Sequence, residues 1–349
     1  MRPPALVTGA PGWLGSRLVT ALVGGLGDVP GLAIPEARHV RCLVLSGTPR
    51  AALADLPAGV ELVFGDVRDP RSLAAFVRGA EGATIFHACG VIRARRLDDF
   101  HAVNVEGTRH LLEAAAAAGV ARVIGISSDA VVGSSRRPDE VFDERSPPRP
   151  RLPYGRSKRL MEDLLRDACA AGRTTTVILR PCRFYGPGQP PARTQFYRLI
   201  RQGRLPIFDG GRSRWSFSYV DDVCQAALLA ERTRHAGGET YWIADGRSHS
   251  IAEIVDTIER LLETELGLVV RHRRLRLPAV VARAAGVTEL WLERLGLVDW
   301  RLHGIARLGV TVACSIAKAE RELGYAPTVG LEEGLRRSLR WCRDHGEVI

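Results

Sequence analysis

The sequence predicts an α/β protein, a doubly wound parallel sheet of the Rossmann type with a smaller lobe in its C-terminal half. Short apolar segments alternate with longer amphipathic ones through residues 1–182, the order expected of a parallel sheet with helices on both faces. After residue 182 the segments shorten and the connections lengthen, starting with a glycine- and proline-rich loop at 186–191. We therefore assign 1–182 to the sheet domain and 183–349 mainly to the lobe, with about 216–245 returning to the sheet.

The individual elements follow from apolar patterning and from helix boundaries. Segments that are short and apolar predict strands, whereas the alanine-rich segment that ends at Gly119 predicts a helix. The proline-rich, polar stretch 138–153 predicts a loop. The expected strands are 5–7, 40–45, 60–64, 84–88, 123–126 and 175–179, and the expected helices include 104–118, 156–170 and 223–230.

A glycine turn follows the first predicted strand at once. Gly9 allows a tight turn from strand to helix, Gly12 leaves room for phosphate oxygens against the main chain, and Gly15 lets the helix pack closely on the sheet. A helix N-terminus reached by such a turn binds the pyrophosphate of a dinucleotide. The spacing is Gly-x-x-Gly-x-x-Gly, and the strand before it and the helix after it favour a dinucleotide site over an ordinary turn.

Composition excludes several other classes of protein. The 349 residues carry a net charge of +10, mostly from arginine, but the arginines are spread along the chain without a nucleic-acid motif. The seven cysteines are scattered, and no Cys or His cluster has metal-ligand spacing. No apolar run approaches the ~20 residues of a membrane span. We expect a cytoplasmic protein without a metal or a nucleic-acid partner, and the sequence allows a homodimer and peripheral membrane contact.

A second motif places a phenol and an ammonium one helical turn apart. Tyr154 is a weak base unless a positive charge stabilises its phenolate, and Lys158 supplies that charge. The ammonium can also bond the ribose hydroxyls of a nicotinamide cofactor. Ser128 follows the fifth strand, at the sheet edge where α/β proteins bind ligands. We predict that Ser128 orients a carbonyl or alcohol while Tyr154 transfers the proton on its oxygen.

With these motifs the chain resembles the extended short-chain dehydrogenases/reductases, which include nucleotide-sugar epimerases, dehydratases and 3β-hydroxysteroid dehydrogenases. The similar segments run nearly end to end: 8–15, 65–69, 87–90, 104–108, 127–133, 180–188, 216–223, 323–327 and 331–335. The resemblance implies that Asp66 bonds the adenine amino group and that residues near His87 and Pro181 line the cofactor. The residues predicted to bind the cofactor are Thr8, Gly9, Gly12, Trp13, Leu14, Gly15, Ser46, Arg50, Asp66, Val67, His87, Ala88, Cys89, Asn104, Tyr154, Lys158 and Pro181.

The choice of cofactor depends on the end of the second strand. An acidic residue there usually bonds the ribose hydroxyls of NAD. Here residues 45–50 contain no carboxylate, and Ser46 and Arg50 could accept a 2′-phosphate. The sequence therefore favours NADP(H), with NAD as the alternative.

Departures from the family's motifs narrow the reaction. Dehydratases carry an acidic pair after the active-site hydroxyl, but here Asp129 is followed by Ala130, which argues against dehydration. The stretch around Trp215 and the leucine-rich segment 275–312 are similar to the steroid dehydrogenase branch and predict an apolar substrate pocket. The predicted substrate-binding residues are Ser128, Arg183, Arg214 and Trp215. If the substrate were instead a nucleotide diphosphate, we would expect it to be bound by Arg183, Arg193, Arg212 and Arg214.

Three functions remain open from the sequence. The first is an NAD(P)(H)-dependent oxidoreductase that acts on a secondary alcohol or ketone, such as a steroid-like, terpenoid or polyketide-like small molecule. The second is a nucleotide-sugar 4-epimerase with bound NAD. The third is a protein that binds the cofactor without turnover, against which the intact set of Ser128, Tyr154 and Lys158 counts.

Overall fold

The computed structural model describes residues 2–94, 96–135, 137, 139–295, 297 and 299–349. Its centre is a seven-stranded sheet in the order β12-β7-β5-β4-β1-β2-β3, and every neighbouring pair of strands is parallel. The predicted doubly wound sheet is therefore confirmed. The strands are β1 (Ala5–Thr8), β2 (Val40–Val44), β3 (Glu61–Phe64), β4 (Thr84–His87), β5 (Arg122–Ile126), β7 (Thr175–Pro181) and β12 (Thr240–Ile243).

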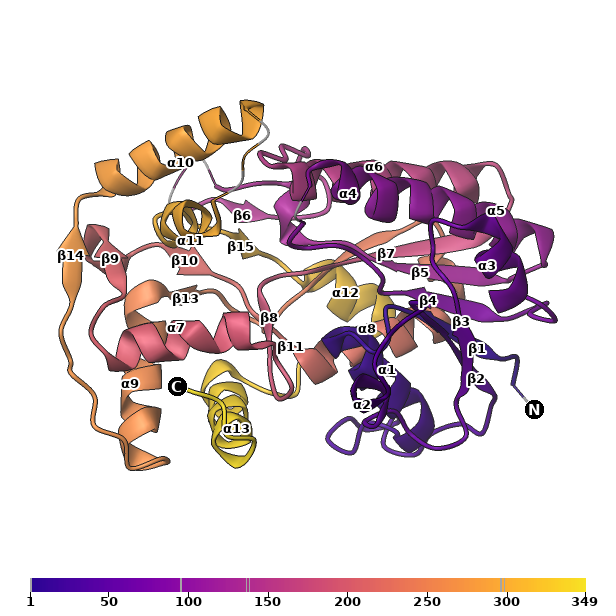
Figure 1. The fold of residues 1–349 in the computed structure, drawn as a ribbon, viewed down its shortest axis with the longest axis horizontal. Helices are drawn as coiled ribbons and strands as arrows, with labels where there is room; N and C mark the ends of the chain where they lie inside the picture. The colour runs from indigo at the N-terminus through magenta and orange to yellow at the C-terminus, as the bar shows by residue number, and fades with distance from the viewer. Residues whose placement is uncertain (1, 95, 136, 138, 296, 298) are drawn as a thin grey trace.

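Helices cover both faces of this sheet (Figure 1). One face carries α3 (Pro70–Phe76), α5 (Gly107–Ala117) and α6 (Pro153–Ala170), and the other carries α1 (Trp13–Gly24), α8 (Val220–Arg232) and α12 (Ala317–Leu323). Alternate strand residues supply the two cores: Leu6 packs with the first group of helices, and its neighbours Ala5 and Val7 pack with the second. Both faces of the strands are therefore buried.

The polypeptide returns to the sheet domain twice after entering the lobe. Helix α8 and strand β12 form the expected return at about 216–245, and α12 packs on both of them. The second return, made by α12, was not predicted from the sequence. It is preceded by β15 (Ala313–Cys314), which pairs with β6 (Val141–Phe142) inside the stretch predicted to be a loop. A short α2 (Arg50–Leu53) follows β2.

The lobe has a separate apolar core. Its helices are α7 (Pro191–Arg201), α9 (Ile251–Thr264), α10 (Ala279–Arg294), α11 (Trp300–Leu308) and α13 (Leu331–Asp344). Its strands are short: β8 (Phe184–Tyr185) pairs with β11 (Ser218–Tyr219), β9 (Pro206–Phe208) with β14 (Leu275–Leu277), and β10 (Arg214–Trp215) with β13 (His249–Ser250). None of the described helices has the length and apolar character needed to cross a membrane.

The predicted helix over 104–118 begins earlier and changes its winding. It starts as α4 (Asp98–His101), passes through a π-helical segment (Ala102–Glu106) and continues as α5. Such π segments are rare and frequently lie at functional sites. Asn104 lies in this segment, facing the start of α6.

Candidate active site

The glycine turn between β1 and α1 has no room for side chains. A Cβ at Gly12 would lie 2.7 Å from the Gly9 carbonyl oxygen, and one at Gly15 would meet the same peptide. Gly9 has φ +94°, and a Cβ there would lie 2.6 Å from the Ala88 carbonyl carbon. The three glycines thus allow the turn, the helix and the β4 edge to approach closely, as the sequence predicts.

The N-terminus of α1 is open to an anion. No side chain caps it, and the first turn holds no acidic residue. Its backbone N–H groups and the helix dipole therefore suit the pyrophosphate of a dinucleotide. Trp13 donates from Nε1 to the Pro187 carbonyl (2.7 Å) and stacks on Phe184 (4.8 Å between ring centroids), which joins this end of the helix to the lobe. Leu14 is buried in the core below.

A buried chain of hydrogen bonds fixes the end of β4. Thr108 Oγ1 donates to the Asn104 carbonyl, so it can accept from His87 Nε2 (2.9 Å). His87 Nδ1 then accepts from Thr8 Oγ1 (2.8 Å), which in turn accepts from the Cys89 backbone N–H. Burial lowers the pKa of His87 to about 3, so the ring is neutral and this relay has one proton arrangement.

The adenine end of the predicted site is held by an ion pair. Arg68 bonds both carboxylate oxygens of Asp66, and this interaction holds the pKa of Asp66 below its usual value. Val67 is buried against Gly107, where a Cβ would lie 2.8 Å from Val67 Cγ2. Ser46 and Arg50 are exposed just beyond β2. Both are therefore accessible to a ligand at this edge.

The three predicted catalytic side chains meet where β5 ends and α6 begins. Tyr154 lies close enough to Ser128 for the serine hydroxyl to affect its pKa, and both residues line the large cavity described below. Burial raises the pKa of Tyr154 to about 12, while Ser128 acts in the opposite direction. The phenol is thus protonated at neutral pH in the free protein.

Lys158 lies below Tyr154 on α6 and is nearly inaccessible to solvent. Its Nζ donates to the Ile126 carbonyl (2.8 Å), and a Cβ at Gly90 would lie 3.2 Å from it. Burial lowers the pKa of Lys158 to about 8. Of the 49 lysines and arginines in the chain, only Lys158 and Lys318 are lysines. This position therefore has a compact ammonium in a chain whose other basic residues are almost all arginines.

Asn104 ties the cofactor-side loop to the catalytic helix. Its side chain donates to the Val91 carbonyl (3.0 Å) and to Ser157 Oγ (2.9 Å) and accepts from the Val91 N–H (2.8 Å). The segment after β4 is therefore held against the start of α6. Asn104 acts here as a positioning residue, and its role in contacting a cofactor remains a prediction.

A buried ion pair holds the framework behind these residues. Glu162, one turn after Lys158, accepts from Ser127 Oγ (2.6 Å) and from Arg180 Nε and Nη2 (2.8 and 2.7 Å). Burial raises the pKa of Glu162, but its hydrogen bonds with Arg180 outweigh that effect and the net pKa lies below its usual value. The ionised carboxylate joins α6 to the ends of β5 and β7, where Pro181 lines the cavity.

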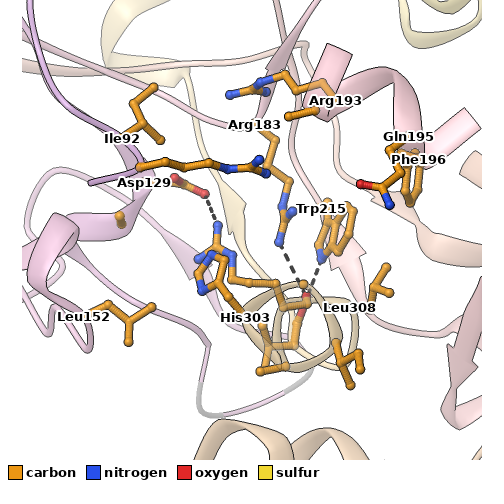
Figure 2. Close-up of a pocket in the computed structure, with 18 of the residues that line it drawn as sticks. Ile92, Asp129, Leu152, Arg183, Arg193, Gln195, Phe196, Trp215, His303 and Leu308 are labelled. Atoms are coloured by element: carbon orange, nitrogen blue, oxygen red, sulfur yellow. Dashed lines mark hydrogen bonds and ion pairs between the residues drawn. The ribbon is translucent and has the colours of Figure 1, made fainter. Parts of the chain in front are cut away.

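The cavity next to Ser128 and Tyr154 has a volume of about 1670 Å³. It runs from the sheet edge into the lobe, between α6, α7, α9, α10 and α11. The predicted substrate residues Arg183 and Trp215 both line it, and so does Arg193. Figure 2 shows Asp129, Arg183 and Arg193 facing the same part of this cavity.

Arg214 and Arg212 lie outside the cavity. Because neighbouring strand residues face opposite ways, Trp215 points inward and Arg214 outward, where its Nε donates to Ser248 Oγ (2.9 Å). Arg212 is exposed and pairs with Asp209. The structure therefore brings together only Arg183 and Arg193 of the four arginines considered for a diphosphate.

An ion pair between the sheet domain and the lobe was not foreseen from the sequence. Asp129 accepts from Ser128 Oγ (2.9 Å) and from Arg307 Nη2 of α11 (3.1 Å). Arg183 Nη2 approaches the Arg307 carbonyl (3.4 Å), and its guanidinium stacks 3.4 Å from the Trp215 ring centroid (Figure 2). No sequence spacing connects residues 129 and 307, so only the fold reveals this pair.

The buried ammonium of Lys158 predicts a pH-dependent stability difference. Its pKa is about 8 in the folded protein and about 10.5 when unfolded, so the folded state binds this proton less tightly. The ammonium thus costs stability below pH 8, and the cost disappears as the pH rises toward 10.5. The free energy of unfolding of Lys158→Met minus that of the wild type should fall by about 3 kcal/mol between pH 7 and pH 10.5. Urea titrations at both pH values measure this, with Lys318→Met as the control; a constant difference would contradict the prediction.

The parallel sheet, the dinucleotide cradle and the Ser128–Tyr154–Lys158 arrangement together define an extended short-chain dehydrogenase/reductase. Residues 5–244 match the NAD dependent epimerase/dehydratase family, and the chain belongs to this family of NAD(P)-binding epimerases, dehydratases and reductases.

Three similar proteins cover nearly the whole chain. An uncharacterised Sinorhizobium fredii protein is 40% identical over 99% of this chain and 96% of its own length. A 4-hydroxy-2-methyl-3-oxo-4-farnesyl-3,4-dihydroquinoline-1-oxide ketoreductase of Stigmatella aurantiaca is 31% identical over 94% of this chain and 93% of its own. The solved structure of a dTDP-glucose 4,6-dehydratase from Streptomyces venezuelae with NAD bound is 29% identical, covers 98% of this chain and 97% of that one, and has a TM-score of 0.73.

Proposed function

We propose that the protein is an NAD(P)H-dependent ketoreductase that acts on an apolar small molecule. The observation that carries this proposal is the placement of Ser128 and a protonated Tyr154 together on the wall of a large cavity. A relative at 31% identity is a ketoreductase with a farnesyl-bearing substrate in its name. We also propose a cytoplasmic location.

The residues support reduction of a carbonyl in a direct way. Reduction adds a hydride from the reduced nicotinamide to the carbonyl carbon, and the oxygen takes a proton, so that a ketone becomes a secondary alcohol. The Ser128 hydroxyl, which donates to Asp129 in the free protein, turns to donate a hydrogen bond to the carbonyl oxygen, and Tyr154 transfers the proton to that oxygen. Lys158 offers a positive charge that stabilises the phenolate left behind. Ala130, in the place of the second acid that dehydratases use, argues against dehydration.

The part of the cavity in the lobe has polar side chains such as Arg198 and Arg204, but many of its side chains are apolar and favour a largely apolar substrate. The apolar side chains come from α7, α9, β14 and α10: Phe196, Leu199, Leu205, Ile254, Ile258, Leu275, Leu277, Val281 and Leu290. Incubation with NADPH and a panel of terpenoid, polyketide and long-chain ketones should consume the reduced cofactor, which its absorbance reports. Turnover of nucleotide sugars alone would contradict the proposal.

A nucleotide-sugar 4-epimerase is the second candidate, because Arg183 and Arg193 face the cavity. Such an enzyme would purify with oxidised cofactor and convert its substrate without net change in nicotinamide absorbance. The ketoreductase would exchange and consume its cofactor. A single purified sample therefore separates the two functions.

For the cofactor we propose NADP(H) over NAD(H). Residues 45–50 bear no carboxylate that would repel a 2′-phosphate, and Arg50 is exposed there. Calorimetric titration should show tighter binding of NADPH, and Arg50→Ala should weaken NADPH about 10–100-fold while leaving NADH unchanged, since a charged hydrogen bond is lost. Arg321→Ala, on the distant α12, is the control. Equal affinities or a preference for NADH would overturn the proposal.

A further inference from the structure

The part of the cavity wall near Ser128 and Tyr154 carries an excess of positive charge. The positive charges of Arg193 and Arg307 lower the pKa of Tyr154, and they also lower the pKa of Arg183. These four groups therefore lie close together. Arg307 pairs with Asp129. The other described acidic side chains lining the cavity, Glu289 and Glu293, pair with His303 and Arg156.

Two of these guanidinium groups have only neutral partners within the described residues. Arg193 Nη1 donates to the Phe184 carbonyl (2.5 Å), and its guanidinium lies 4.7 Å from the Phe184 ring centroid. Arg183 approaches a backbone carbonyl and stacks on Trp215. Asp129 acts on both guanidinium groups but forms its ion pair with Arg307, so one carboxylate serves three arginines and this end of the cavity is suited to an anion.

Arg183 is the better placed of the two to bind one. Its guanidinium is held flat on Trp215, which is itself fixed by a hydrogen bond from Nε1 to the Val310 carbonyl (2.9 Å). Its buried Nε has no hydrogen-bond partner among the described residues. Burial, followed by the neighbouring Arg307, holds the pKa of Arg183 well below its usual value although Asp129 acts in the opposite direction, and the charge of a bound anion would raise that pKa.

The opposite end of the cavity has a different chemistry. In the lobe it is lined by the apolar residues Leu199, Leu205, Ile254, Ile258 and Leu277, together with Arg198, Gln202 and Arg204 from α7 and the turn that follows it. The total volume of about 1670 Å³ exceeds the ~300–1,000 Å³ of an ordinary small-molecule site. Such a space accommodates a long apolar chain in addition to the reacting group.

From the cationic end and the apolar arm we infer that the substrate is a long-chain oxo acid. Its carboxylate, close to the reacting carbonyl, binds Arg183 with Arg307 beside it, and its alkyl chain lies along the apolar arm. The inference rests on the proposed ketoreductase function and adds to it the substrate's charge and shape. It replaces the expectation of an uncharged steroid-like ketone, and of the four arginines considered for a diphosphate it uses only Arg183.

The test uses the stable alcohol forms in the oxidative direction. With NADP⁺, 3-hydroxydodecanoate should have a KM about 10–100-fold lower than its methyl ester, since a charged hydrogen bond is lost in the ester. Arg183→Met should remove this preference by raising the KM of the acid only. Arg214→Met, one residue before Trp215 but outside the cavity, should retain it. Equal KM values for acid and ester in the wild type would overturn the inference.

A separate variant tests the apolar arm, the part of the cavity lined by Leu199, Leu205, Ile254, Ile258 and Leu277. Leu277→Trp should raise the KM for 3-hydroxydodecanoate while leaving that for 3-hydroxybutyrate unchanged, because only the longer chain reaches the arm. An unchanged KM for both would contradict the placement of the chain.

A binding measurement separates failure of the inference from failure of the proposed function. With cofactor present, dodecanoate should bind more tightly than methyl dodecanoate in calorimetry, and Arg183→Met should abolish the difference. If no alcohol is oxidised but this difference is found, the proposed reaction is wrong and the anion site stands. If alcohols are oxidised but dodecanoate and its methyl ester bind equally, the proposed reaction stands and the inference of an oxo-acid substrate is wrong. Preferential binding of uridine diphosphate that depends on Arg183 would also overturn the oxo acid.

Discussion

Tyr154→Phe should reduce turnover of a ketone substrate by about 10²–10⁴-fold and leave cofactor affinity nearly unchanged. The phenol lies beside Ser128 on the cavity wall, and burial raises its pKa to about 12, so at neutral pH it holds the proton that reduction requires. Phenylalanine keeps the ring and its tilted packing on Phe100 (6.3 Å between centroids) but cannot supply a proton. Steady-state rates with saturating NADPH measure the effect.

Tyr185→Phe provides a matched control in the same cavity. The Tyr185 hydroxyl is buried without a hydrogen-bond partner among the described residues, and it lines the cavity from β8. Its removal should leave the rate within a few-fold of the wild type. Near-normal turnover by Tyr154→Phe, or an equal loss in both variants, would show that Tyr154 is not the proton donor.

The sequence predicts those parts of the site that depend on local spacing. Gly9, Gly12 and Gly15 are close enough in the chain for their turn to be inferred directly, and the structure shows that side chains at these positions would clash. Tyr154 and Lys158 lie one helical turn apart, so a helix alone places them on one side. The alternation of strands and helices likewise sufficed to predict the sheet, which the structure confirms.

The parts that were missed depend on contacts between distant segments. Asp129 and Arg307 meet because α11 of the lobe packs over the end of β5, and no local pattern encodes that contact. Arg214 was predicted to bind substrate, but its position depends on which face of a two-residue strand is turned inward, and Trp215 occupies that face. Short strands carry too little alternation to indicate their orientation.

The largest expected effect on stability concerns Glu162, which joins the catalytic helix to two strands of the sheet. Glu162→Gln should lower the free energy of unfolding by about 3–5 kcal/mol, because Arg180 would keep its charge in a buried site without a counter-ion. Both side chains are almost fully shielded, at 0% and 3% exposure, so water cannot replace the lost carboxylate. Urea unfolding at neutral pH measures the difference.

A variant of the neighbouring residue Asp163 is the control, because this carboxylate is exposed whereas that of Glu162 on the same helix is buried. Its carboxylate pairs with Arg159 and Arg166 at the surface, where such pairs contribute at most about 1 kcal/mol, so Asp163→Asn should have a small effect. Glu162→Gln should also reduce kcat at a temperature where the variant is still folded. Glu162 lies one turn after Lys158 and accepts a hydrogen bond from Ser127, the neighbour of Ser128, so its loss should displace both catalytic side chains. Comparable stability losses in the two variants, or a stable Glu162→Gln protein with normal kcat, would show that this ion pair does not hold the catalytic side chains in place.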